Sequence, residues 1–155
     1  MLTFLLFYVL VIPIIVLMHE IGHGIGVVCI SKSHVHVYLG SRNEGNKENL
    51  KLGRLHLHIY WSYVGYAVWD GNLDKRQKAI ALAGGPFMSL LLGILFGIMV
   101  IVVPPGDLHS FLWGITIFNI SQFVLTTIPI TYPRWMVDIS RQGHIMKQCF
   151  NKGVV

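Results

Sequence analysis

The residues most able to do chemistry form the stretch HEIGH, in which His19, Glu20 and His23 interrupt an otherwise apolar segment. If that segment is helical, two histidines four residues apart lie on one face of the helix, where both imidazoles can bind one Zn²⁺. Glu20, beside the first histidine, is poorly placed as a third ligand, but it can accept a proton from water that the metal activates. The motif therefore predicts a metal-dependent hydrolytic site with two imidazole ligands and Glu20 as the general base.

The apolar surroundings of HEIGH strengthen this interpretation. A charged side chain at the centre of a membrane-spanning helix costs about 2.5–3.5 kcal/mol on insertion scales, so ionisable residues there usually face the protein interior and serve a function. The alternative is a polar contact between helices, in which the histidines form hydrogen bonds across a helical bundle. We favour a metal in a wet cavity over this purely structural role.

The composition indicates a membrane protein with a single domain over residues 1–155. The chain is 54% hydrophobic and 12% charged, about half the charge of a typical soluble domain. Three apolar segments, at about 2–30, 79–103 and 111–130, are long enough to cross a bilayer. The first lacks the basic start and the small-residue cleavage site of a secretory signal peptide. The fold class that we predict is therefore an all-α membrane protein with a three-transmembrane-helix core.

The basic residues predict the orientation of these spans. All 12 lysines and arginines lie either between the first two spans or in the tail at 131–155. By the positive-inside rule, the N-terminus is then outside and both basic stretches, including the C-terminus, are cytoplasmic. We expect an integral, multi-pass protein of a bacterial cell membrane. The net charge of +5 is in this view a topology signal, and we predict no nucleic-acid partner.

Between the first two spans, the sequence predicts a small β-structure at about 34–61. HVHVYLG (34–40) and LHLHIYW (55–61) alternate with period two, as strands do, and the polar stretch between them is a plausible hairpin connection. We therefore expect a β-hairpin or small sheet at the cytoplasmic face, followed by an aromatic segment, WSYVGYAVWD, at the membrane interface. Each strand carries two histidines on one face: His34, His36, His56 and His58. A solvated face is the favoured interpretation of these histidines, and a second metal site is the alternative.

A catalytic zinc usually has three protein ligands and one water, so HEIGH needs a further ligand from elsewhere in the chain. The two imidazoles lie about 10–16 Å from the inner end of the first span, at 1.5 Å per residue. Asp107 falls on the outer side and is therefore excluded. Asp138 lies just beyond the inner end of the third span, in the apolar context WMVDI. We predict Asp138 as the third ligand and keep His144 as the alternative.

Three features, taken together, resemble the site-2 protease family of zinc intramembrane metalloproteases. HEIGH at 19–23 lies within a spanning helix, and LAGGPFMS at 82–89 opens the next span, like the Ala-Gly-Pro-x-x-Asn segment of the family. TTIPITYPRWMVD at 126–138 resembles the Asn-x-x-Pro stretch that leads to an Asp-Gly in the family. The strand-forming region between the first two motifs, including VGYAV, is also similar. The match covers most of the chain, and HEIGH is its most specific part.

The resemblance implies a three-helix core that cuts a membrane-spanning protein substrate within or near the lipid bilayer. The strand region would guide that substrate as an added β-strand. The site residues implied are the metal ligands His19, His23 and Asp138, the general base Glu20, and the substrate-binding residues Gly85, Pro86 and Ser89.

Three positions depart from the family pattern. Ser89 stands where the family commonly has Asn, Thr126 stands near another usual Asn, and Ile139 follows Asp138 where the family has Gly. The missing Gly motivates an alternative function, a non-catalytic protease-like membrane protein that binds a partner or a metal. A metal transporter is a weaker hypothesis, because three spans are few for a transport path.

Overall fold

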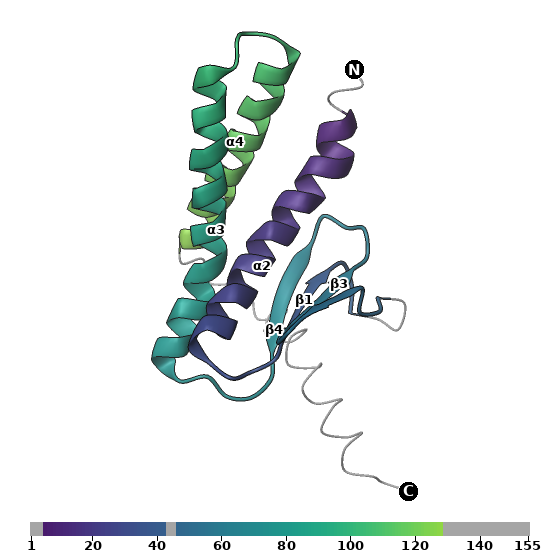
Figure 1. Cartoon of the computed structure of the whole chain (residues 1–155), viewed down its shortest axis with the longest axis vertical. Helices are drawn as coiled ribbons and strands as arrows, with labels where there is room; N and C mark the ends of the chain where they lie inside the picture. The colour runs from purple at the N-terminus through teal and green to yellow at the C-terminus, as the bar shows by residue number, and fades with distance from the viewer. Residues whose placement is uncertain (1–4, 43–45, 129–155) are drawn as a thin grey trace, which may run out of the picture.

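The computed structural model describes residues 5–42 and 46–128 and consists of three long helices with a small sheet. A π-helical turn, η1 (Phe7–Val11), continues directly into α2 (Ile12–Ile30), and two further helices follow, α3 (Lys75–Val102) and α4 (Asp107–Thr127). Helix α2 lies between the α3–α4 pair on one side and the sheet on the other (Figure 1). It therefore joins the helical part of the molecule to the β-structure.

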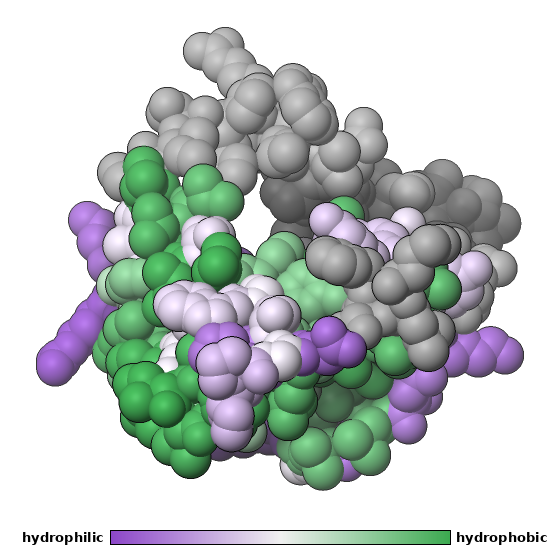
Figure 2. Space-filling model, turned by 90° about the horizontal axis from the view of Figure 1, so that it is seen from above, coloured by the Kyte–Doolittle hydropathy of each residue, from purple (hydrophilic) through white to green (hydrophobic). Residues whose placement is uncertain are grey.

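Each of the three helices is long and apolar enough to cross a bilayer. The candidate spans are Phe7–Ile30, Lys75–Val102 and Asp107–Thr127, with 24, 28 and 21 residues, and about 20 apolar residues suffice. Large apolar side chains such as Ile94, Leu95 and Ile98 are exposed on α3. Seen from above, hydrophobic residues gather on the outer surface of the helical part (Figure 2). The three predicted segments are confirmed as helices, and their character indicates a membrane protein.

Helix α3 begins at Lys75, earlier than the predicted residue 79, because a capping box precedes the apolar run. The main-chain N–H of Gln77 donates to the Asp74 carboxylate at 2.7 Å, and the N–H of Asp74 donates to Gln77 Oε1 at 3.1 Å. This reciprocal pair satisfies N–H groups that a helix start leaves without partners. Pro86 consequently lies inside α3, and it does not begin the helix.

The β-region forms a four-stranded sheet with the order β2-β3-β1-β4. Its strands are β1 (Val35–Leu39), β2 (Leu50–Leu52), β3 (Leu55–Ile59) and β4 (Gly65–Trp69). The predicted β-hairpin or small sheet is confirmed as a small sheet, but the two histidine-bearing strands do not form a hairpin, because β1 pairs with β3 in parallel. Strand β3 instead forms a hairpin with β2, through a turn in which Gly53 has a φ of 60°. The aromatic segment predicted at the membrane interface contains β4, which pairs antiparallel with β1 at the edge of the sheet.

The two faces of the sheet differ sharply in character. Val35, Val37, Leu55 and Leu57 are buried on the face toward α2, where they form the hydrophobic core with residues such as Val27. The contact is close, since a Cβ at Gly24 of α2 would come within 2.6 Å of Leu55. The histidines alternate with these apolar residues and therefore lie on the opposite face. The apolar residues that alternate with the histidines thus pack the sheet against the helix that carries HEIGH.

Helices α2 and α3 approach each other closely through glycines. A Cβ on Gly22 or on Gly84 would collide with the main chain of the opposite helix, and a Cβ on Gly26 would lie 3.1 Å from the carbonyl oxygen of Ile80. Small residues at such positions allow helix backbones to pack tightly in membranes. This approach brings α3 within side-chain reach of the HEIGH imidazoles.

Candidate active site

The two HEIGH imidazoles lie side by side on the surface of α2 that faces α3. Their ring centroids are 4.9 Å apart and the ring planes are nearly perpendicular, at 84°. His19 is buried, with 3% of its surface exposed, and His23 is partly buried. The spacing of four residues therefore places both rings on one helical face, as predicted.

Each imidazole is held by α3 through its Nδ1 atom. His19 Nδ1 lies 2.8 Å from the hydroxyl of Ser89, which is itself buried, and His23 Nδ1 lies 2.9 Å from the carbonyl oxygen of Ala81. In the tautomer with the proton on Nδ1, the His19 ring donates to Ser89 and keeps the Nε2 lone pair. His23 donates to Ala81 in the same tautomer, whereas in the other tautomer its Nδ1 accepts from the N–H of Gly85. Histidines that bind a metal usually donate their other ring N–H in this way. Two neighbouring imidazoles are a donor pair that zinc accepts, and the Nε2 atom of His23 lies against Gly85 of α3.

The glycines before Pro86 form a notch in α3 that receives the His23 ring. A Cβ at Gly85 would collide with that ring, and the main-chain nitrogen of Gly85 lies 3.2 Å from His23 Nδ1. The glycines of this motif therefore let α3 approach α2 closely. The predicted contacts of Gly85, Pro86 and Ser89 with substrate stay predictions, although two of these residues already contact the imidazoles.

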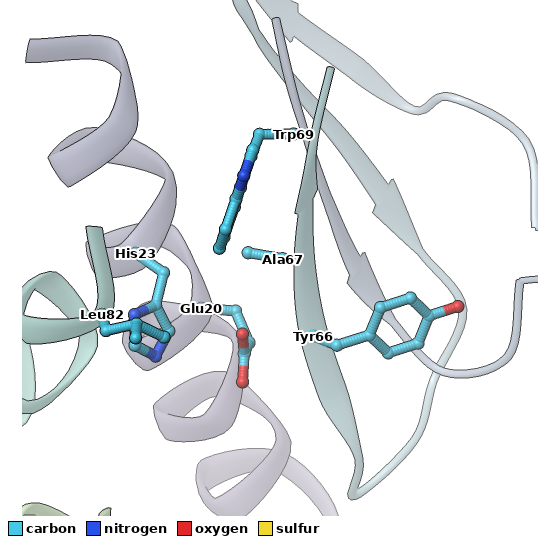
Figure 3. A pocket seen from close by; sticks show the side chains of 6 residues that line it. All are labelled: Glu20, His23, Tyr66, Ala67, Trp69 and Leu82. Atoms are coloured by element: carbon cyan, nitrogen blue, oxygen red, sulfur yellow. The ribbon is translucent and has the colours of Figure 1, made fainter. Parts of the chain in front are cut away.

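Glu20 faces a pocket of about 210 Å³ between α2, α3 and the edge strand. The pocket is lined by Glu20, His23, Tyr66, Ala67, Trp69 and Leu82 (Figure 3). The Glu20 carboxyl interacts with the backbone of Ala67. Gly65 leaves room for this side chain, because a Cβ there would come within 2.7 Å of Glu20 Cγ. Since a water molecule occupies about 30 Å³ in the liquid, the pocket can hold several waters beside a carboxyl group.

The main chain of β4 presents an open edge beside this pocket. Gly40 N–H donates to the carbonyl of Val64, and Asp70 N–H donates to the carbonyl of His34, so the even-numbered residues of this segment pair with β1. In an antiparallel strand, the intervening residues direct their N–H and C=O groups to the other side. Among the residues that the structure describes, the main-chain groups of Gly65, Ala67 and Trp69 therefore lie at the edge without a neighbouring strand, and the Ala67 backbone contacts Glu20.

The predicted third ligand, Asp138, and its alternative, His144, lie outside the described residues. Within residues 5–42 and 46–128, no other His, Cys, Asp or Glu forms a metal-ligand group with the two HEIGH imidazoles. The structure thus brings together two of the three predicted ligands and the predicted base.

Two amide side chains on α4, the buried Asn119 and the partly buried Gln122, were not among the predicted site residues. Asn119 is fully buried and donates through Nδ2 to the carbonyl of Ile115 at 2.9 Å. The Asn119 Oδ1 and Gln122 Oε1 atoms have no hydrogen-bond partner among the residues that the structure describes. The sequence could have indicated them, because amide side chains inside an apolar span need a polar partner in the bundle.

A second polar cluster lies on the face of the sheet opposite α2. His36, Glu48 and His58 each offer one ligand atom, and these atoms lie within 4.8 Å of one another, so the group could hold a metal ion. A hydrogen bond from His56 holds the pKa of the Glu48 carboxyl below its usual value, which favours the carboxylate. The prediction that the histidines of each strand share a face is confirmed.

No family model, curated protein or solved structure matches the chain. The function of the chain is therefore inferred from the residues of the site and their geometry.

Proposed function

We propose that this protein is a zinc-dependent intramembrane endopeptidase similar to the site-2 proteases. The observation that carries the proposal is the pair of adjacent HEIGH imidazoles, each fixed to α3 through Nδ1, with Glu20 facing the neighbouring pocket. His19, His23 and Asp138 would hold the metal. Its substrate would be a membrane-spanning segment of another protein.

Zinc, when bound, would supply a Lewis acid that lowers the pKa of water and polarises the scissile carbonyl. Glu20 removes a proton from the attacking water, whose oxygen forms a bond to the carbonyl carbon. The C–N bond then breaks, and Glu20 passes the proton to the leaving amine nitrogen. The pocket beside Glu20 would hold the attacking water within the helical part of the molecule.

The open edge of β4 gives the substrate a place to bind as an extended strand. An extended peptide can pair with the outward main-chain groups of Gly65 and Trp69, a recognised mode of peptide binding, while the backbone of Ala67 contacts the Glu20 carboxyl. A substrate helix must unwind locally before cleavage, because its carbonyl groups are engaged in helical hydrogen bonds. Pairing with β4 would hold the unwound segment beside Glu20.

The decisive experiment compares Glu20→Gln with the unchanged chain in detergent or in liposomes. We expect the variant to lose cleavage of a model transmembrane peptide by at least about a hundredfold, the loss expected for a general base, while its zinc content is unchanged. Asp107→Asn is the matched control, since it also neutralises one acidic residue but lies exposed at the start of α4.

Three results would decide against the proposal. If Glu20→Gln cleaved the peptide as fast as the unchanged chain, Glu20 would not be the general base. A zinc-loaded unchanged chain that never cuts a transmembrane peptide would favour the non-catalytic alternative, in which the protein binds a partner or a metal. Equal loss of cleavage in Asp107→Asn would mean that the effect is not specific to Glu20.

A further inference from the structure

The outer face of the sheet carries two matching pairs of histidines between neighbouring strands. His36 Nδ1 of β1 lies 3.1 Å from His58 Nε2 of β3, and His34 Nδ1 lies 3.1 Å from His56 Nε2. The rings of His36 and His56 also stack, with centroids 4.6 Å apart. The parallel register of β1 and β3 therefore gathers four imidazoles that are distant in sequence.

The spacing of the His36–His58 pair is that of two ligands of one metal ion. Two nitrogens that each bind a tetrahedral ion at about 2.0–2.1 Å lie about 3.3 Å apart, close to the 3.1 Å between these atoms. A direct N–H···N hydrogen bond has a similar length. The distance alone thus fits either a shared metal ion or a direct hydrogen bond. A neighbouring anionic ligand favours the metal ion.

Glu48 supplies that anionic ligand from the segment before β2. One of its carboxylate oxygens lies within 4.8 Å of ligand nitrogens on both His36 and His58. Its Oε2 is 2.7 Å from His56 Nδ1, so the side chain is already oriented toward the cluster. Carboxylates that bind metals are commonly fixed by such a hydrogen bond. With His58 buried and Glu48 39% exposed, the group is anchored by the sheet and reachable from solvent.

We propose that His36, His58 and Glu48 form a second metal site, for a divalent transition metal, on the face of the sheet opposite the HEIGH helix. Two imidazoles and one carboxylate suit Zn²⁺, Co²⁺ or Ni²⁺ rather than Ca²⁺ or Mg²⁺, which prefer oxygen ligands. His56 is a positioning residue that holds the Glu48 carboxylate. A bound ion joins β1, β3 and the segment before β2, and thereby stiffens the sheet whose edge strand lines the pocket beside Glu20.

The test measures Co²⁺ and Zn²⁺ binding to the full chain in detergent, purified with a tag that contains no histidine. His36→Gln should lose one bound ion per chain relative to the unchanged protein. Glu48→Gln should weaken the same site at least tenfold, and His109→Gln, which changes a histidine at the start of α4, should bind as the unchanged chain does. Added metal should raise the thermal unfolding temperature of the unchanged chain more than that of Glu48→Gln.

A double variant, His19→Gln with His23→Gln, separates this site from the one at HEIGH. We expect it to keep the ion that His36→Gln loses, whether or not the HEIGH site binds zinc. The proposal is overturned if the unchanged chain binds no ion outside HEIGH, or if His36→Gln and Glu48→Gln both bind as the unchanged chain does. Because the Glu48 side chain is partly exposed, Glu48→Gln decides the question even if His36→Gln does not fold.

Discussion

At the scale of single residues, the candidate site depends on which ring nitrogen of each histidine stays available. Ser89 and the carbonyl of Ala81 contact the two Nδ1 atoms, so Nε2 is the ring atom that each histidine would offer in the proposed zinc site. The spacing of HEIGH predicted the pairing of the imidazoles, because it depends only on the pitch of one helix. The oxygens that orient them come from α3, and local sequence could not predict those contacts.

Ser89→Ala should weaken zinc binding at HEIGH by about 10- to 100-fold, the usual effect of removing a group that orients a metal ligand. The substitution removes the hydroxyl that accepts from His19 and leaves almost the same side-chain volume. Competition with a chelator measures the affinity, in a chain that also carries His36→Gln so that the sheet site does not contribute. Ser121→Ala, on the exposed surface of α4, is the matched control. An unchanged affinity would show that Ser89 does not orient the ligand.

At the scale of elements, glycines on α3 and β4 leave the space that HEIGH side chains need. The period-two alternation predicted the two histidine-bearing strands as neighbours, but as an antiparallel hairpin, whereas they pair in parallel. Alternation reports which face of a strand is buried, whereas pairing depends on the path of the connecting segments. The parallel β1–β3 pair, and the position of β4 beside Glu20, were therefore beyond prediction from local sequence.

Gly85→Ala should displace the His23 ring and so remove zinc binding at HEIGH. The added methyl group would collide with the imidazole, and overpacking of this kind costs about 1–3 kcal/mol of stability. Gly97→Ala is a matched control in the same helix, because its Cβ would lie 3.6 Å from Thr116 in ordinary contact. Zinc content and thermal unfolding measure both effects. A Gly85→Ala chain with full zinc content would contradict the contact.

Gly65→Ala should separate metal binding from catalysis. Its Cβ would come within 2.7 Å of Glu20 Cγ and 3.1 Å of Val16, so we expect the carboxyl to move while the imidazoles keep their positions. The variant should retain zinc and lose cleavage of a transmembrane peptide by at least about tenfold, as misplacement of a reacting group does. If zinc and cleavage fell together, β4 would be supporting the whole site rather than positioning Glu20.

At the scale of the whole molecule, the two ends of the helical part differ in charge. The segment at 31–78 carries eight of the 12 lysines and arginines, and the connection between α3 and α4 carries none. The C-terminal end of α2 and the N-terminal end of α3 lie at the same end of the molecule as the sheet. The connection between α3 and α4 lies at the opposite end (Figure 1). The sheet and both candidate metal sites therefore lie closer to the strongly basic side.

This arrangement predicts that the sheet side of the molecule is cytoplasmic and the α3–α4 connection is outside. In a chain whose native cysteines are replaced by serine, we expect Pro105→Cys to react with a membrane-impermeant maleimide in intact cells. Lys51→Cys, at the exposed β2 strand, should react only after the cells are lysed. The reverse labelling pattern would mean that the molecule has the opposite orientation in the membrane. Glu20 would then lie nearer the outer surface, and a predicted third ligand beyond the end of α4 would lie outside the cell.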